Sequence, residues 1–347
     1  MTSGAGLGLS LRDYLADTAE PGIAALVSAI ADASRPLIAM IRRGPILGSL
    51  GAGSGGSNKD GDVQKALDVL ADRQFLHGLQ VAGVRAIASE EADEPHSVSA
   101  DGEFLVAIDP LDGSSNIETN VSIGTIFSIL PAAPGRSAEP GDFLIQGHRQ
   151  KAAGFLIYGP QASIVFTTGT GTHAATHDPE SDDFVMTALS LSIPEDVPEF
   201  AINASNYRFW HPPVQAYVND CVSGTDGPMS RNFNMRWIAS LVADAYRILM
   251  RGGAFLYPAD SRHGYERGRL RHVYEASPIA FLIEQADGAA TDGVNRILDH
   301  QPASLHARVP LVFGSMQTVA RIRRYHLETE DSADLSPLFG RRGLMRR

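Results

Sequence analysis

Hydrophobic residues recur at helical spacing through residues 21–43 and again through residues 62–79. One face of the second segment is lined by Val63, Ala66, Leu67 and Leu70. Asp62 is placed to cap its N-terminus. Pro36 lies inside the first segment, and because proline lacks a backbone N–H we expect it to break or kink that helix. The pattern therefore predicts two helices in the first part of the chain.

Short apolar runs punctuated by glycine and proline follow. They cover residues 84–91, 104–110, 121–131 and 154–169. Their content of β-branched residues is typical of strands. Since no helical pattern lies between them, we expect an antiparallel sheet with the first helices packed on it.

The pattern changes after about residue 199, where helical and strand-like segments alternate. We expect helices over residues 235–253 and 277–290, and strands over 254–258, 269–276 and 309–315. The first of these helices has an apolar stripe of Trp237, Ile238, Leu241, Val242, Ala245 and Leu249, and ends at Gly252 and Gly253. The chain is therefore expected to form two domains, residues 1–198 and 199–347, built as stacked α/β layers.

Composition narrows the class of protein. The chain has 347 residues, a formal net charge of −11 and no basic stripe, so we expect no nucleic-acid partner. The single cysteine, Cys221, favours a reducing compartment and has no sequence context for a nucleophile. We find neither a signal-peptide pattern nor an uninterrupted apolar run near 18 residues. A cytoplasmic protein without a membrane span is expected.

Two further patterns are weak. Residues 44–61 are rich in glycine but lack the Gly-Lys-Ser/Thr ending of a P-loop, so we interpret them as a flexible flap that closes over a site. His173 and His177 are four residues apart in a turn-like segment without a third ligand, and surface histidines explain them better than a zinc site.

The strongest chemical signal is the stretch AIDPLDGSSNI, residues 107–117, at the end of a predicted strand. Two carboxylates, Asp109 and Asp112, lie three residues apart, and burying both is costly unless a cation compensates. Mg²⁺ prefers such hard oxygen ligands. Gly113, Ser114 and Ser115 follow and offer backbone N–H groups and hydroxyls to a phosphate. An Asx-rich turn remains the alternative for this stretch alone.

A second acidic strand end precedes it. The stretch SEEADE places Glu90 and Glu91 after the preceding predicted strand. Taken alone it could be a solvated acidic turn. If the two strands are neighbours, however, both glutamates arrive at the same end of the sheet as Asp109, and the two stretches together favour a metal site.

These residues resemble the signature of class 1 fructose-1,6-bisphosphatases, within the magnesium-dependent sugar and inositol phosphatase superfamily. Five blocks occur in the family's order: GDVQKALDVL, SEEADE, AIDPLDGSSNIETNVSIGTIFSI, LVADAYRILMRGGAFLYPAD and GRLRHVYEASPIAFLIEQADGAAT. The resemblance extends from about residue 23 to residue 326. It implies an α/β (α+β) protein with a layered α/β/α/β/α sandwich, assembled as a homotetramer.

The resemblance also implies roles for individual residues. The implied metal ligands are Glu90, Asp109, Asp112, Glu275 and the Leu111 carbonyl, for two or three Mg²⁺ ions per subunit, with Mn²⁺ as a substitute. The catalytic residues are Asp68, Glu91 and Asp62. The leaving phosphate is bound by Asp112, Gly113, Ser114 and Ser115, and the retained phosphate and sugar by Asn203, Arg236, Trp237, Tyr257 and Arg269. Arg236 matches an arginine that, in the family, reaches into the neighbouring subunit's site.

Some positions depart from the better-known animal enzymes. Arg269 replaces a usual lysine, and Asn206 and Trp237 replace usual tyrosines. Where animal enzymes hold AMP with a Lys-Tyr pair and an arginine, this chain has Glu103, Phe104 and Pro131. We therefore expect weak or absent inhibition by AMP through that site.

The implied reaction is Mg²⁺-dependent hydrolysis of the 1-phosphate of fructose 1,6-bisphosphate. A bifunctional enzyme that also hydrolyses sedoheptulose 1,7-bisphosphate in carbon fixation stays open, as does a gluconeogenic role. An inositol monophosphatase-like activity fits less well, because the arginines and Tyr257 imply a second phosphate. A non-catalytic sugar-phosphate-binding scaffold is disfavoured by the intact set of acidic residues.

Overall fold

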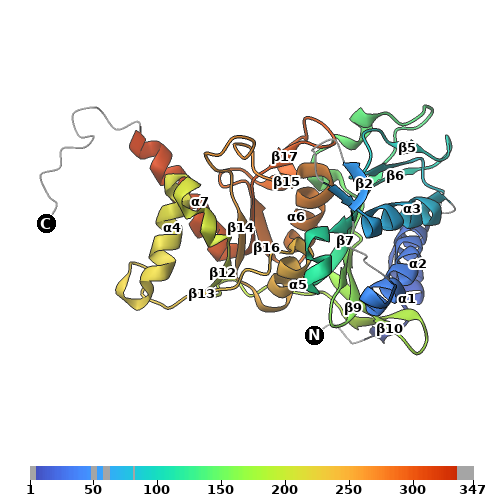
Figure 1. Cartoon of the computed structure of the whole chain (residues 1–347), viewed down its shortest axis with the longest axis horizontal. Coiled ribbons are helices and arrows are strands. Elements are labelled where there is room, and N and C mark those ends of the chain that lie inside the picture. The colour runs from blue at the N-terminus through green and yellow to red at the C-terminus, as the bar shows by residue number, and fades with distance from the viewer. Residues whose placement is uncertain (1–4, 48–52, 58–62, 81–82, 334–347) are drawn as a thin grey trace, which may run out of the picture.

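The computed structural model describes residues 5–47, 53–57, 63–80 and 83–333. Its layers run from α4 and α7 at one end, through a five-stranded sheet, a central pair α5 and α6, and an eight-stranded sheet, to α1–α3 at the other end (Figure 1). The helices are α1 (Leu11–Thr18), α2 (Pro21–Arg43), α3 (Ala66–Gln80), α4 (Pro212–Ser223), α5 (Leu241–Arg251), α6 (Ser277–Glu284) and α7 (Met316–Ala333). The predicted α/β/α/β/α sandwich is confirmed.

The eight-stranded sheet has the order β11-β10-β9-β8-β7-β6-β4-β5. Its strands are β4 (Ala86–Ser89), β5 (His96–Ser97), β6 (Phe104–Asp112), β7 (Ile123–Pro131), β8 (Ala152–Tyr158), β9 (Ala162–Thr167), β10 (His173–Asp178) and β11 (Asp183–Ala188). All neighbours are antiparallel except β4 and β6, which are parallel. Every residue of β6 is buried, because helices cover both faces of the sheet.

The first three helices cover one face of this sheet and form a hydrophobic core with it. The predicted break in α2 was wrong: the helix is continuous through Pro36, and buried Ile30 and Leu37 pack on either side of it. By length and composition α2 could also cross a membrane, but just over half of its apolar window is buried inside the protein, which assigns it to the core.

The expected apolar face of α3 also needs correction. The helix begins at Ala66, three residues after Val63, and Leu70 is exposed. Leu67, Ala71, Phe75 and Leu79 are instead the buried positions, at four-residue spacing. This face packs against the sheet and α2.

The five-stranded sheet has the order β13-β12-β14-β18-β16. Its strands are β12 (Glu199–Ala201), β13 (Asn234–Met235), β14 (Ala254–Tyr257), β16 (Gly288–Thr291) and β18 (Leu311–Ser315). One face packs on α5 and α6, which also contact the eight-stranded sheet, and the other face packs on α4 and α7. The central helices therefore share a core with both sheets.

Three predicted elements in this half have different bounds. The helix expected over residues 277–290 ends at Glu284, and residues 288–290 belong to the strand β16. The helix expected from residue 235 begins only at Leu241, because residues 234–236 pair with β12 and Ala239 has a φ of 65°. The strand expected over residues 269–276 is confined to β15 (Leu270–Arg271) and leads into a helical turn.

The remaining elements are small. β15 pairs with β17 (Arg308–Val309), β2 (Gly53–Ser57) pairs with β3 (Val63–Lys65), and β1 (Ala5–Gly8) lies near β11. The short helices are η1 (Gly44–Leu47), η2 (Ser114–Thr119), η3 (Pro140–Phe143), η4 (Gly147–Arg149), η5 (Ala204–Phe209), η6 (Gly224–Asp226), η7 (His272–Ala276) and η8 (Ile297–Asp299). Part of the expected glycine-rich loop is thus a strand. Residues 44–47 of that loop form η1, and residues 48–52 and 58–61 lie outside the described part of the chain.

The two histidines set aside as surface residues are in fact buried in β10. The hydroxyl of Tyr14 lies 3.3 Å from Nδ1 of His173. Nε2 of His177 lies 2.9 Å from a carboxylate oxygen of Asp182. These contacts give both histidines structural partners.

Candidate active site

Three buried carboxylates converge between the two sheets. Asp109 and Asp112 come from the end of β6, and Glu275 comes from η7 just before α6. Each offers an oxygen within 4.8 Å of the others. Each side chain belongs to a residue that is at least nine-tenths buried. A cluster of this kind is suited to a hard divalent cation.

A β-bulge brings the two aspartates together. Asp109 pairs with Ile126 of β7, but Asp112 pairs with Gly124, so three steps on β6 match two on β7. In a regular strand residues three apart point to opposite faces, and the extra residue removes that alternation. Pro110 suits the bulge because it has no N–H to lose from the ladder.

One carbonyl of this turn already has a partner within the protein: the Thr125 hydroxyl donates to the Pro110 carbonyl at 2.9 Å. The role of the Leu111 carbonyl as a metal ligand stays a prediction.

Strand pairing brings the second acidic stretch to the same place. β4 lies parallel to β6 with Ser89 opposite Ile108, and the Glu90 N–H donates to the Ile108 carbonyl at 2.9 Å. Glu90 therefore follows β4 beside Asp109, as the sequence predicted. Its carboxylate forms an ion pair with Arg271, a partner with a 12% exposed side chain that the sequence reasoning missed.

The electrostatics of the cluster reflect crowded negative charge. Burial and the nearby carboxylates, Glu90 first among them, raise the pKa of Asp109 well above its usual value. Burial raises the pKa of Asp112 to about 6. Burial and then Asp112 raise the pKa of Glu275 to about 8. A bound cation would relieve this repulsion, so the chemistry of the donor set fits a divalent metal ion.

Asp112 also joins the two halves of the molecule. One of its carboxylate oxygens accepts a hydrogen bond from the backbone N–H of Val242 at 3.1 Å. Val242 lies in the first turn of α5, where the cap residue Ser240 makes no side-chain hydrogen bond. Asp112 thus satisfies an N–H at a helix N-terminus, a contact between distant segments that spacing along the sequence could not show.

The residues expected to bind the leaving phosphate lie at this junction. Gly113 has a φ of 79°, which favours glycine, and precedes η2, whose first residues are Ser114 and Ser115. The Asn116 side chain donates to the Ala239 carbonyl at 2.8 Å and so ties η2 to the start of α5. The turn is therefore fixed beside the carboxylate cluster.

Of the three expected catalytic acids, the structure describes two, Asp68 and Glu91. Asp68 is buried in the first turn of α3, which packs against β6 and β4. Glu91 lies in the turn after β4, and its N–H donates to the Ser89 hydroxyl at 3.3 Å. The His306 ring contacts the carbonyl of Ala92 in the same turn. Asp62 lies outside the described residues.

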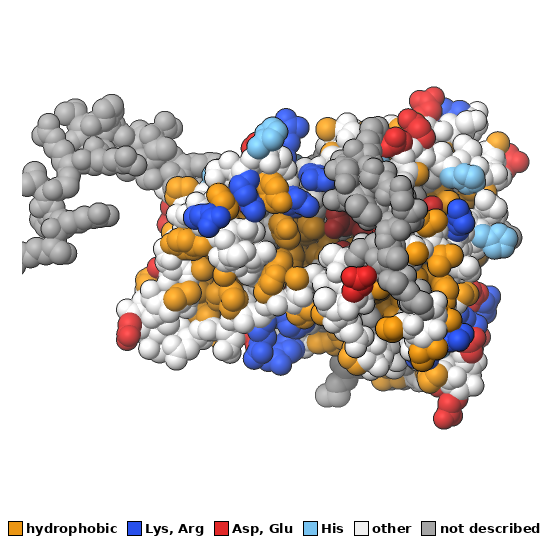
Figure 2. All heavy atoms as spheres, viewed as in Figure 1, with side chains coloured by type: hydrophobic (Ala, Val, Ile, Leu, Met, Phe, Trp, Pro, Cys, Tyr) orange, Lys and Arg blue, Asp and Glu red, His pale blue; other side chains and the backbone are white. Residues whose placement is uncertain are grey.

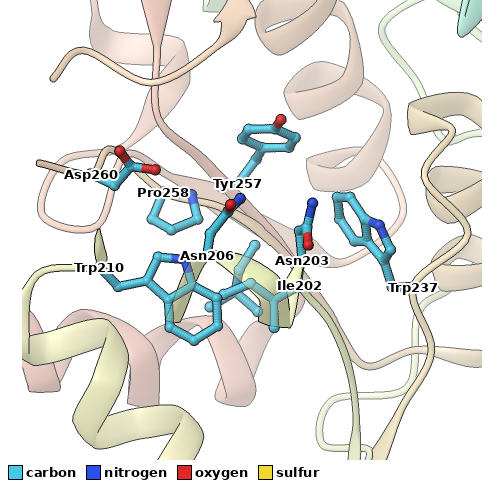
Figure 3. A pocket seen from close by; sticks show the side chains of 9 residues that line it. Ile202, Asn203, Asn206, Trp210, Trp237, Tyr257, Pro258 and Asp260 are labelled. Carbon is cyan, nitrogen blue, oxygen red and sulfur yellow. The ribbon is translucent and has the colours of Figure 1, made fainter. Parts of the chain in front are cut away.

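A pocket opens in the C-terminal half of the chain (Figure 3). Its lining residues are Ile202, Asn203, Asn206, Trp210, Trp237, Leu256, Tyr257, Pro258 and Asp260. The side chains of Asn203, Trp237 and Tyr257 lie around it from three separate segments, as Figure 3 shows. Trp237 stacks on Phe255 with ring centroids 5.6 Å apart, which fixes its orientation. The structure therefore brings three expected substrate-binding residues together.

The two expected arginines lie differently. Arg269 donates to the Tyr265 hydroxyl at 2.5 Å, and its charge partly offsets the effect of burial on the pKa of Tyr257, so it is near the pocket. Arg236 is half-exposed and ion-paired to the buried Glu199 at 3.0 Å. The contact of Arg236 with another subunit stays a prediction.

The pocket and the carboxylate cluster are neighbours. Burial raises the pKa of Tyr257, which lines the pocket, and the charge of Glu275 is close enough to add to that rise. In Figure 2 acidic side chains are recessed near the middle of the face shown, with hydrophobic and basic side chains on the side of the C-terminal half. The carboxylate cluster thus adjoins a pocket lined by amides and aromatic rings, with Arg269 near it.

The sequence matches two family models, described as the N-terminal and C-terminal domains of fructose-1-6-bisphosphatase, over residues 12–189 and 193–327. The class 1 fructose-1,6-bisphosphatase of Rhizobium meliloti (strain 1021) is 52% identical over 346 residues, covering 98% of this chain and 99% of that protein. That of Paracoccus denitrificans (strain Pd 1222) is 53% identical over 330 residues, covering 95% and 97%.

The fold is also found among solved structures. The crystal structure of Leishmania major fructose-1,6-bisphosphatase in holo form superposes with a TM-score of 0.86 at 31% identity, covering 92% of this chain and 99% of that one. Its apo form gives a TM-score of 0.81 at 29% identity. With both family models matched in order and relatives above 50% identity over nearly the whole length, the chain belongs to the class 1 fructose-1,6-bisphosphatase family.

Proposed function

We propose that the carboxylate cluster of Asp109, Asp112 and Glu275 is the centre at which the chain removes the 1-phosphate of fructose 1,6-bisphosphate. Family membership makes the chain a phosphatase that hydrolyses fructose 1,6-bisphosphate. The observation that carries the proposed site is the convergence of three buried carboxylates within 4.8 Å beside the pocket.

Mg²⁺ is the proposed metal, with two or three ions per subunit and Mn²⁺ as a substitute. Glu90, Asp109, Asp112, Glu275 and the Leu111 carbonyl would hold it. When bound, a divalent cation neutralises phosphate charge and lowers the pKa of an attacking water. Glu90 would exchange its ion pair with Arg271 for the metal.

The chain's own residues orient and deprotonate the reactants. Glu91, with Asp68 and Asp62 nearby, would accept the proton of the attacking water. The turn of Gly113, Ser114 and Ser115 would present its N–H and hydroxyl groups to the leaving phosphate. Phosphoryl transfer depends mainly on positioning and charge neutralisation, and the fixed carboxylates and the rigid turn would supply both.

The pocket would hold the rest of the substrate. Asn203, Tyr257 and Trp237 offer an amide, a phenol and an indole N–H, and Arg269 offers a guanidinium for the retained phosphate. Arg236 would act across a subunit interface in a homotetramer. We further propose a cytoplasmic location and a division into domains 1–198 and 199–347, because the second sheet begins with Glu199.

The test is phosphate release by the purified protein with Mg²⁺. Fructose 1,6-bisphosphate, sedoheptulose 1,7-bisphosphate and inositol 1-phosphate are compared, each with an EDTA control. We expect EDTA-sensitive release from the first. Comparable release from the second would restore the bifunctional alternative, which the names of the relatives do not favour. If no phosphate were released from any of the three substrates, the result would support the alternative of a non-catalytic sugar-phosphate-binding scaffold.

AMP should inhibit weakly or not at all. Phe104 is buried, and its ring lies so close to Gly22 in the first turn of α2 that an added Cβ would come within 2.6 Å of it. The Phe104 ring thus fills the space beside the first turn of α2, and Glu103 and Pro131 supply no cation for a nucleotide phosphate. We expect less than about twofold inhibition at 1 mM AMP.

Initial rates with and without AMP check this expectation at a substrate concentration near KM. Micromolar inhibition that Glu103→Ala removes would show that AMP binds at this position after all.

A further inference from the structure

A ladder of alternating arginines and aromatic rings is joined to the pocket lining at Asp260. The Arg269 guanidinium carbon lies 4.6 Å from the ring centroid of Tyr265, and that of Arg262 lies 4.0 Å from the same centroid. Arg262 and Arg208 in turn lie 4.9 and 4.5 Å from the ring of Phe209. Such contacts stabilise guanidinium groups in fixed orientations.

The ladder is anchored in the pocket wall through its middle member, Arg262. Arg262 donates through Nε to both carboxylate oxygens of Asp260, at 3.0 and 3.1 Å. Asp260 lines the pocket and is buried. Asp260 therefore neutralises the charge of Arg262 and fixes its position. Arg262 supports the ring of Tyr265 by stacking on it and does not offer a free charge to a ligand.

The loop that carries the ladder is fixed by its own backbone. The Tyr265 carbonyl accepts N–H groups of Asp260 at 3.2 Å and Gly268 at 3.0 Å, and the Tyr265 N–H donates to the Arg262 carbonyl at 3.0 Å. Gly268 has a φ of 78° and lies against the backbone of residues 309–310. The ring of Tyr265 is thus a rigid support.

Arg269 differs from Arg262 in having its charge available. Within the described part of the chain no carboxylate forms an ion pair with Arg269, and its one side-chain hydrogen bond is to the Tyr265 hydroxyl. A free arginine side chain has several rotatable bonds whose ordering costs entropy on binding. Tyr265 removes much of that freedom in advance, and it can do so because a guanidinium both stacks on the ring and donates to its oxygen.

We propose that Tyr265, supported by Arg262 and Asp260, is a positioning residue that holds the Arg269 guanidinium ready for the second phosphate of the substrate. This inference rests on the proposed function, in which Arg269 binds that phosphate. Tyr265 touches neither reacting atoms nor metal, so it is not a catalytic residue. It affects binding of a bisphosphate and leaves the chemical step to the carboxylate cluster.

The test is a double-mutant cycle of Tyr265→Phe and Arg269→Lys. Tyr265→Phe keeps the ring but removes the hydroxyl acceptor. We expect it to raise KM for fructose 1,6-bisphosphate by about five-fold with kcat within about twofold. In the Arg269→Lys enzyme, whose ammonium cannot both stack and donate in the same way, adding Tyr265→Phe should change KM by less than about twofold.

Controls separate positioning from general damage. Fructose 1-phosphate lacks the second phosphate, so its kcat/KM should be the same, within about twofold, in the wild type and Tyr265→Phe. Tyr246→Phe, which removes an exposed hydroxyl hydrogen-bonded to Gln161 at 3.3 Å, is the matched tyrosine control. Thermal unfolding of each variant reports on folding.

Equal effects of Tyr265→Phe in both backgrounds, or an equal loss with fructose 1-phosphate, would overturn the inference. So would an unchanged KM. Failure of the wild-type protein to hydrolyse fructose 1,6-bisphosphate would instead refute the proposed function, and the two failures are distinguishable because the wild type is measured first.

Discussion

Asp112→Asn is expected to lower kcat for fructose 1,6-bisphosphate by about 10³-fold or more while the protein remains folded. A factor of this size corresponds to about 4 kcal/mol of transition-state stabilisation, which is within the range that a metal site supplies. Asparagine keeps an acceptor for the Val242 N–H, so the cap at the start of α5 survives. It removes the charge that a metal ligand needs.

The folded state of this variant is part of the prediction. Asp112 is buried beside Asp109 and Glu275, and removing one of three crowded charges relieves repulsion. We therefore expect the metal-free variant to unfold at the same temperature as the wild type or higher. Steady-state kinetics with Mg²⁺ and thermal unfolding in EDTA measure the two quantities.

The matched control is Asp183→Asn, which removes a carboxylate that pairs with Arg35 at 2.9 Å on a remote part of the molecule. It should leave kcat within about twofold, because surface ion pairs contribute little. Retention of more than about a tenth of wild-type kcat by Asp112→Asn would contradict the assignment of Asp112 as a metal ligand.

The acidic cluster shows how far the sequence alone reaches. Two acidic strand ends in succession suggested that Glu90 would lie beside Asp109 if the two strands were neighbours. They are neighbours, but as a parallel pair in a sheet that was expected to be antiparallel, and it is the parallel pairing that brings the two ends together. The bulge that turns Asp109 and Asp112 to one side was not predictable. It depends on register against β7, and register is a property of paired strands rather than of either strand alone.

In the second half of the chain, the hydrophobic pattern predicted the wrong start for a helix. Periodicity extended the α5 helix back through Trp237, but pairing of residues 234–236 with β12 overrides local helical preference. This correction matters for the site, because an extended segment before Ser240 carries Trp237 to the pocket. Glu275 was found only through the family resemblance, since a lone acid after apolar residues carries no signal of its own.

The second large effect is a pH dependence of stability that a metal ion should remove. In EDTA, lowering the pH from 8 to 6 should raise the unfolding temperature by about 4 °C. The pKa of Glu275 is about 8 in the folded protein against an ordinary 4.5, so between these values the folded state holds a proton that the unfolded chain has released. Stability is therefore greatest at low pH and is lost as the pH rises through 8. For this one proton the free energy of unfolding falls by about 2.3 kcal/mol between pH 6 and pH 8.

The same measurement in millimolar Mg²⁺ isolates the cluster from other titrating groups. His272, whose pKa burial lowers to about 4, acts in the opposite direction between pH 6 and 8, but it does so equally with and without metal. A metal ion bound by Glu275 keeps the carboxylate ionised, so the gain at low pH should shrink to within about 1 °C or reverse. Glu275→Gln should show the flattened dependence even in EDTA, because glutamine has no proton to bind. An equally steep dependence in EDTA, in Mg²⁺ and in Glu275→Gln would mean that this carboxylate neither carries the proton nor meets the metal.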